Sequence, residues 1–239
     1  MKNFLRKVIP KNLWSNLKEI AWAYTDWVSY KSYSSEGEDM ILRKIFYKKE
    51  KGFYVDIGAY HPKKASNTYY FYKKGWSGIN IDAMPGSMKL FNRLRKRDIN
   101  LEIPIGREGE VVKYYEFEDK ALNGFESDSL LAKDQSKVQN QLRRIHQLKS
   151  QSLNSILETY LPKSQTIDFI SIDVEGQEFQ ILESFEFEKY KPSWLLIEIW
   201  QLEYLNCQSH PLVNLLISKG YSVKAKCLNT VFLKKKLTI

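Results

Sequence analysis

The sequence predicts an α/β fold in which helices cover both faces of a mostly parallel sheet. Short apolar runs, typical of buried strands, alternate along the chain with segments of helical spacing. The connections between them are short, as expected for parallel strands joined by crossover helices. The 239 residues suffice for one such domain with a full core and leave little room for a second.

Five apolar runs are predicted to be strands of this sheet. They are short, and the first two have glycines beside them; they span residues 53–57, 78–82, 101–105, 167–173 and 194–199. Residues 221–226 and 230–234 are predicted to form a closing hairpin that adds an antiparallel strand. Residues 111–117 alternate like a hairpin extension.

The segments between the strands carry helical spacing. Helices are predicted over residues 37–47, 68–74, 87–97, 153–160, 177–185 and 211–219. Residues 119–150 are polar and are predicted to be a lid or an insertion, within which 130–148 can form a weak helix. The main domain is therefore expected to span residues 33–239.

Residues 1–32 are predicted to form a separate, basic, amphipathic helical extension. Its apolar side chains recur at helical spacing: Leu13, Leu17, Ile20, Tyr24, Trp27 and Val28. One interpretation is an interfacial helix in which residues 1–30 contact a membrane peripherally or bind a partner. The other is a helix packed on its own domain.

Composition and charge narrow the expected partners and location. The net charge of +9 favours anionic partners, but the basic residues are scattered, so no nucleic-acid groove is predicted. The two cysteines, Cys207 and Cys227, lie far apart, which fits a reducing compartment. Without a signal-peptide pattern or a long apolar stretch, the chain is predicted to be cytoplasmic.

Two strand ends predict a ligand that contains a nucleoside. Gly58 directly follows the first strand, where a glycine permits a tight turn and the close approach of a ligand. Asp82 ends the second strand, 24 residues after Gly58, at a spacing suited to accepting hydrogen bonds from ribose hydroxyls. The two residues together are stronger evidence for a nucleoside ligand than either residue is alone.

Carboxylates gather at the other strand ends. Asp173 and Glu175 follow the fourth strand, with Glu178 just beyond, and Glu198 lies in the apolar fifth strand. The first three can act as a general base, bind an acceptor or hold a divalent metal, and the alternative is that Asp173 or Glu175 merely caps the next helix. Glu198 is either a strand end that faces a cleft or a loop residue after a strand that ends earlier. His61 follows the glycine turn and is either a base, a ligand contact or a structural hydrogen-bonding group.

Together these segments resemble the FkbM-type methyltransferases over about residues 33–235. The resemblance rests on Tyr-Ser-Ser-Glu-Gly-Glu-Asp at 33–39, the strand and turn at 53–59, Gly-Trp-Ser-Gly-Ile-Asn-Ile-Asp at 75–82, the run 168–178 and Leu-Ile-Glu-Ile at 196–199. Three positions depart from the family pattern: Tyr60 and Pro62 stand where further glycines are usual, and Ser35 stands where glutamine is usual.

The resemblance implies the Rossmann-like class I methyltransferase fold, a seven-stranded sheet with one antiparallel strand. It also implies S-adenosylmethionine as methyl donor and O-methylation of a sugar, a glycan or a secondary metabolite. The positions that match or adjoin the family's cofactor site are Asp56, Gly58, Ala59, Tyr60, Asp82, Ala83 and Ile105. The basic surface makes an anionic or lipid-linked acceptor plausible, and the oligomeric state stays open.

For catalysis we expect direct transfer of the methyl group to a hydroxyl, with Asp173 as the base. Glu175 and Glu198 would shape the acceptor site, with His61 in reserve. In a less favoured alternative these three carboxylates hold Mg²⁺. Two other classes stay open: an NAD-dependent enzyme on a similar sheet, and a non-catalytic adaptor that uses the amino-terminal helix.

Overall fold

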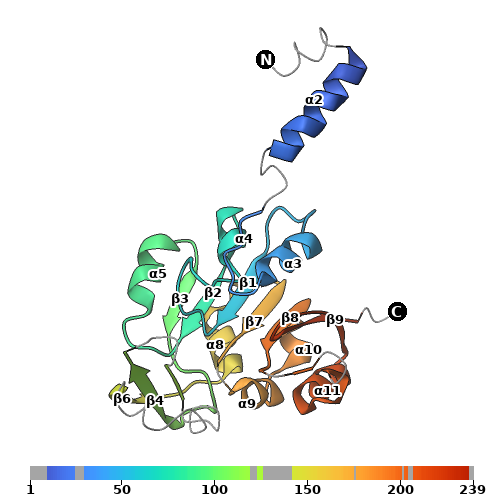
Figure 1. Cartoon of the computed structure of the whole chain (residues 1–239). Helices are drawn as coiled ribbons and strands as arrows, with labels where there is room; N and C mark the ends of the chain where they lie inside the picture. The colour runs from blue at the N-terminus through green and yellow to red at the C-terminus, as the bar shows by residue number, and fades with distance from the viewer. Residues whose placement is uncertain are drawn as a thin grey trace. The chain divides into compact units, whose positions relative to one another are not determined.

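The computed structural model describes residues 10–24, 30–118, 123–125, 142–174, 176–200, 202–203 and 207–236. The chain divides into two units, Met1–Ser32 and Tyr33–Ile239. The second unit contains both sheets (Figure 1).

A seven-stranded sheet forms the centre of the second unit. Its strands are β1 (Phe53–Ile57), β2 (Ser77–Asp82), β3 (Ile99–Glu102), β7 (Phe169–Ile172), β8 (Trp194–Glu198), β9 (Tyr221–Cys227) and β10 (Thr230–Lys235). They lie in the order β3-β2-β1-β7-β8-β10-β9. The pairs among β3, β2, β1, β7 and β8 are parallel, whereas β10 runs antiparallel to both of its neighbours. The predicted Rossmann-like fold with one antiparallel strand is confirmed.

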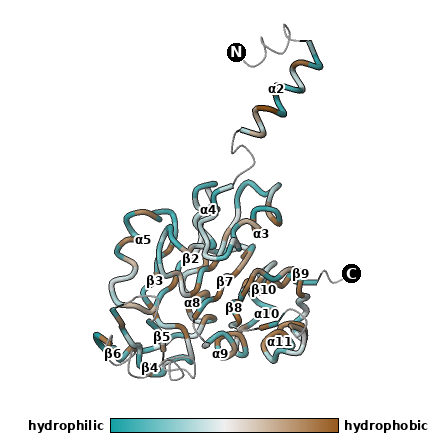
Figure 2. Tube along the Cα trace, in the orientation of Figure 1, coloured by the Kyte–Doolittle hydropathy of each residue, from teal (hydrophilic) through white to brown (hydrophobic). Residues whose placement is uncertain are grey.

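Helices cover both faces of this sheet because its strands are apolar on both. On one face, α8 (Leu153–Tyr160), α9 (Glu178–Glu183), α10 (Phe187–Tyr190) and α11 (Pro211–Ser218) pack against a core that includes Val55, Ile79 and Ile197. On the other, α3 (Glu38–Ile45) and α4 (Tyr69–Lys73) pack against Tyr54 and Phe169, and α5 (Met88–Leu94) lies on the same side (Figure 1). Hydrophobic residues gather along the central strands β7 and β8 (Figure 2). A short 3₁₀ helix, Cys207–Ser209, precedes α11.

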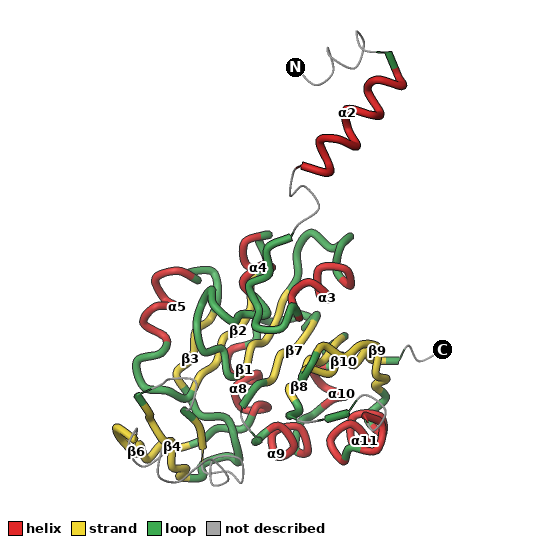
Figure 3. The backbone as a smooth tube through the Cα atoms, viewed as in Figure 1, coloured by secondary structure: helices red, strands yellow, loops and turns green. Residues whose placement is uncertain are grey.

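A second, three-stranded sheet lies beyond the end of β3 (Figure 3). It consists of β4 (Val111–Phe117), β5 (Gly124–Phe125) and β6 (Leu142–Lys149), with β4 in the middle. Residues 142–148 therefore belong to a strand, and the weak helix predicted over 130–148 is wrong there. Antiparallel pairing with β4 along the whole of β6 outweighs the weak local helical preference. Residues 130–141 lie outside the described part.

The first unit contains one described helix, α2 (Lys11–Tyr24), and none of its residues is buried. Leu13, Leu17 and Ile20 lie on this helix, whereas Trp27 and Val28 of the predicted stripe lie outside the described residues. Among the described helices, none is long and apolar enough to cross a membrane. Peripheral membrane contact through residues 1–30 stays a prediction, as does packing on the domain.

Candidate active site

A pocket of about 580 Å³ opens at the carboxyl ends of β1, β2 and β7. Gly58 follows β1, Asp82 ends β2 and Asp173 follows β7, and all three line this pocket. Strand order reverses between β1 and β7, and ligands bind at such switch points in open α/β sheets. The volume lies within the range of small-molecule and cofactor sites.

Gly58 brings two strand ends into direct contact. Its φ is +79°, a conformation that favours glycine, and its N–H donates to the Ile81 carbonyl oxygen at 2.9 Å. A Cβ at this position would lie only 1.7 Å from the carbonyl oxygen of Asp173. A glycine is therefore required here because the Asp173 backbone approaches so closely. The spacing in the sequence did not indicate this contact.

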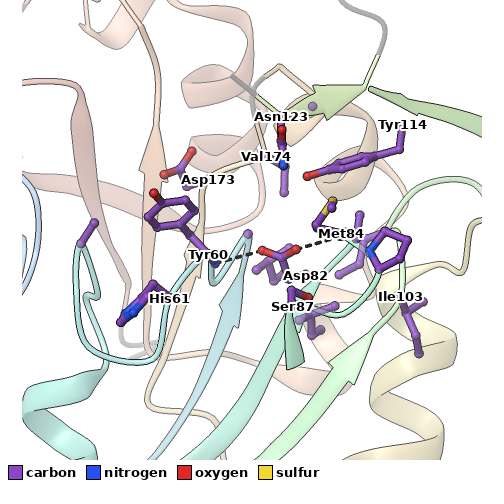
Figure 4. Close-up of a pocket in the computed structure, with 18 of the residues that line it drawn as sticks. Tyr60, His61, Asp82, Met84, Ser87, Ile103, Tyr114, Asn123, Asp173 and Val174 are labelled. Carbon is purple, nitrogen blue, oxygen red and sulfur yellow. Dashed lines mark hydrogen bonds between the residues drawn. The ribbon is translucent and has the colours of Figure 1, made fainter. Parts of the chain in front are cut away.

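Asp82 ties the turn after β1 to the end of β2. Its Oδ2 accepts from the N–H of Tyr60 at 3.0 Å, and its Oδ1 accepts from the N–H of Met84 at 2.8 Å (Figure 4). Burial raises the pKa of Asp82, and these two backbone hydrogen bonds oppose the rise. Each carboxylate oxygen keeps capacity for a second hydrogen bond, so both can accept from a ligand hydroxyl.

The pocket is polar at one end and largely apolar at the other. Tyr60 and Asp173 lie to one side of Asp82, and Met84 and Ile103 lie to the other (Figure 4). Ala83, which follows Asp82, and the buried Ile105 also line the pocket. A flat apolar ring beside a polar group that carries hydroxyls fits this distribution.

Two predicted cofactor contacts lie outside the set of residues that line the pocket. Asp56 is buried, and its Oδ2 accepts from the Thr68 hydroxyl at 2.6 Å. Ala59 is buried against Met88 and Phe91. Both residues are buried and lie next in sequence to residues that line the pocket: Asp56 precedes Ile57, and Ala59 lies between Gly58 and Tyr60.

His61 lines the pocket but is committed to its own loop. Its Nδ1 accepts from the backbone N–H groups of Lys63 and Lys64, at 3.1 and 3.0 Å. A neutral ring in this arrangement carries its proton on Nε2, where it donates rather than accepts. This geometry favours a positioning or hydrogen-bonding role for His61 over that of a base.

Asp173 lies where the large pocket meets a smaller, polar one. The smaller pocket, of about 30 Å³, is lined by Asp173, Glu198, Ser171 and Glu38, among others. Glu198 is the last residue of β8 and faces this space, so the structure brings it close to Asp173 but outside the large pocket. Asp173 itself is exposed.

The other two carboxylates that follow β7 belong to Glu175 and Glu178. Glu175 lies outside the described residues. Glu178 is buried at the start of α9, and its carboxylate accepts from the N–H groups of Val174 and Gly176. It therefore fixes the loop next to Asp173.

Sequence reasoning missed one wall of the pocket. Tyr114 of β4 and Asn123, Gly124 and Phe125 line it from the small sheet, and the rings of Tyr114 and Phe125 pack edge to face at 5.2 Å. The alternation in 111–117 predicted a strand, but nothing local indicates that the strand lies over the strand ends. Ser35, Lys64 and Lys89 also line the pocket without having been predicted to do so.

Within the described residues, no group of three or more His, Cys, Asp or Glu side chains is arranged to hold a metal ion. Asp173 and Glu198 share the small polar pocket, but Glu175, the third member of the Mg²⁺ alternative, is not described.

Comparison with known proteins identifies the family. The model of the methyltransferase FkbM domain matches residues 56–223, which is more than half of the chain. The chain belongs to the FkbM methyltransferase family. The matched range contains Gly58, Asp82, Asp173 and Glu198, so these candidate site residues of this FkbM methyltransferase lie within the family domain.

The chain was also compared with solved structures and with curated proteins. A solved structure of a TehB-like SAM-dependent methyltransferase from Corynebacterium glutamicum ATCC 13032 aligns at 10% identity and a TM-score of 0.43, covering 95% of this chain and 97% of that one. A TM-score this low does not bear on the function of this chain. No curated protein matches.

Proposed function

We propose that this protein is an S-adenosylmethionine-dependent O-methyltransferase that acts on a hydroxyl of a sugar, a glycan or a secondary metabolite. The observation that carries the proposal is the joint lining of one pocket by Gly58 and Asp82, from neighbouring parallel strands. Membership of the FkbM methyltransferase family supports the reaction class.

The pocket residues fit this donor. Asp82 offers carboxylate oxygens to ribose hydroxyls, and the apolar Met84, Ile103 and Ile105 suit an adenine ring. The turn from Gly58 to Tyr60 would border the methionine part, on the side of Asp173. When bound, S-adenosylmethionine supplies an already activated methyl group, so the chain mainly orients the reactants and excludes water.

Asp173 is the group best placed to take the proton of the acceptor hydroxyl. It lines both the large pocket and the small polar one, which Glu198 and Ser171 also line. A hydroxyl is a poor nucleophile at neutral pH, and a positioned base typically contributes about 10²- to 10⁴-fold in rate. We assign the base to Asp173 and the shaping of the acceptor site to Glu198, with Glu175 as a further member of the acceptor site.

Asp173→Asn is expected to lower methyl transfer by about 100-fold or more, while affinity for S-adenosylhomocysteine changes by less than about threefold. Transfer would be measured with isotopically labelled donor on a panel of sugar and glycan acceptors, including anionic and lipid-linked ones. Affinity would be measured by calorimetry.

Glu183→Gln is the matched control, because it removes one exposed carboxylate from α9 outside both pockets. It should leave transfer unchanged. Turnover of Asp173→Asn close to that of the wild type would remove Asp173 from this role.

A further inference from the structure

A fully buried arginine connects the wall of the pocket to the sheet beneath it. The guanidinium of Arg95 donates to Asp98 at 2.8 Å, to the Tyr54 hydroxyl at 2.8 Å and to the Asn80 side chain at 3.2 Å. Arg95 and Asp98 form an ion pair with no exposed side-chain surface. Buried ion pairs are weak evidence of stabilisation, because desolvation offsets their attraction, so another role for Arg95 should be sought.

Two more bonds of Arg95 point to that role. Its Nη1 donates to the carbonyl oxygen of Pro62 at 3.1 Å, and its Nη2 donates to the Thr68 hydroxyl at 3.1 Å. Thr68 in turn donates to Asp56 at the end of β1, at 2.6 Å. Arg95 thus holds the middle and the end of the loop 58–68 that connects β1 to α4.

This loop, called the β1–α4 loop below, forms a large part of the pocket wall. It contributes Gly58, Tyr60, His61, Pro62, Lys64 and Ala65. Tyr60 and Ala65 have φ values of +51° and +50°, which cost a residue with a side chain about 1–2 kcal/mol each. Such conformations persist only where the surroundings fix them. Asp82 holds the N–H of Tyr60, and the contacts of Arg95 and Thr68 hold the loop at Pro62 and at its end.

We propose that Arg95 and Thr68 are positioning residues that hold the β1–α4 loop in the shape that binds the methyl donor. The proposal rests on the proposed function for the identity of the ligand, but not for the restraint of the loop. Asp56 belongs to the same unit and acts through Thr68 rather than by touching the ligand. Burial raises the pKa of Asp56 to about 6, and the Thr68 hydroxyl and the charge of Arg95 oppose the rise, so the carboxylate depends on both partners.

The test compares Thr68→Val, Thr68→Ser and Tyr54→Phe in the full chain. Thr68→Val keeps the side-chain shape but removes the hydroxyl, and Thr68→Ser retains the hydroxyl. Tyr54→Phe is the matched control, because it removes another hydroxyl from the same arginine without touching the loop. Each loss of a buried hydrogen bond should lower stability by a similar amount.

Two readouts separate positioning from stability. Hydrogen–deuterium exchange of peptides that cover 58–68 should rise about fivefold or more in Thr68→Val, stay near wild type in Tyr54→Phe and recover in Thr68→Ser. Affinity for S-adenosylhomocysteine, by calorimetry, should fall about tenfold in Thr68→Val alone, because binding must then order the loop.

Three outcomes would overturn the proposal: wild-type exchange in Thr68→Val, equal loosening of the loop in Tyr54→Phe, or no recovery in Thr68→Ser. If the wild-type protein does not bind S-adenosylhomocysteine at all, the proposed function fails. The exchange measurements would then still decide whether the Thr68 hydroxyl, through its bonds to Arg95 and Asp56, holds the loop.

Discussion

Gly58→Ala is expected to lower the melting temperature by about 10 °C and to abolish binding of the methyl donor. The new Cβ would lie 1.7 Å from the carbonyl oxygen of Asp173, a backbone atom that cannot swing aside. The ends of β1 and β7 would have to separate, in addition to the strain of a φ of +79°. We estimate a cost of about 3–5 kcal/mol, and each 1 kcal/mol lowers the melting temperature of a chain of this size by about 2–4 °C.

Gly75→Ala is the control that separates the steric contact with Asp173 from the backbone strain of a positive φ. Gly75 has a φ of +94°, and a Cβ there would meet no atom within 4 Å. It should therefore cost about 1–2 kcal/mol from backbone strain alone and leave donor binding intact. Thermal unfolding and calorimetry on both variants check this. Equal losses in Gly58→Ala and Gly75→Ala would show that the approach of Asp173 to Gly58 is unimportant.

Asp82→Ala is expected to weaken binding of S-adenosylhomocysteine by about 30-fold or more. The substitution removes the acceptor for ribose hydroxyls, and hydrogen bonds to a charged group contribute about 1.5–3 kcal/mol each. It also frees the N–H groups of Tyr60 and Met84, which the carboxylate now holds. Calorimetric titration measures the affinity, and circular dichroism confirms that the variant is folded.

Glu102→Ala is the control for Asp82→Ala. Glu102 pairs with Asp82 in register on the neighbouring strand β3, is exposed and lies outside the residues that line the pocket. It tests whether the loss of one negative charge nearby is enough to weaken binding, and it should leave the affinity within about twofold. An Asp82→Ala protein that binds like the wild type would contradict the assignment of the ribose site.

The positions of the central strands could be predicted because β1, β2, β7 and β8 are almost entirely buried and their apolar runs are unmistakable. The exact residues at which the strands begin and end could not be predicted. The third strand was predicted over 101–105, but β3 spans Ile99–Glu102. Pro104 lacks an N–H to continue the ladder, although Ile103 and Ile105 prolong the apolar run.

The candidate site could be predicted in part. Gly58 and Asp82 follow from position and spacing, because strand ends in a parallel sheet share one edge. The direction in which Asp56 points could not be predicted, because β1 is buried on both faces and its apolar pattern does not distinguish one face from the other. The partner network of Asp56 depends on Arg95, far along the chain, and the wall from β4 depends on pairing with β6, which local sequence does not encode.

Calorimetric titration of the wild-type chain with S-adenosylhomocysteine and, separately, with NAD tests the central claim most directly. If Gly58 and Asp82 enclose the nucleoside of a methyl donor, S-adenosylhomocysteine should bind with a dissociation constant in the micromolar range, on the order of −8 kcal/mol, and NAD should not compete. No heat of binding with S-adenosylhomocysteine, or tighter binding of NAD, would contradict the assignment.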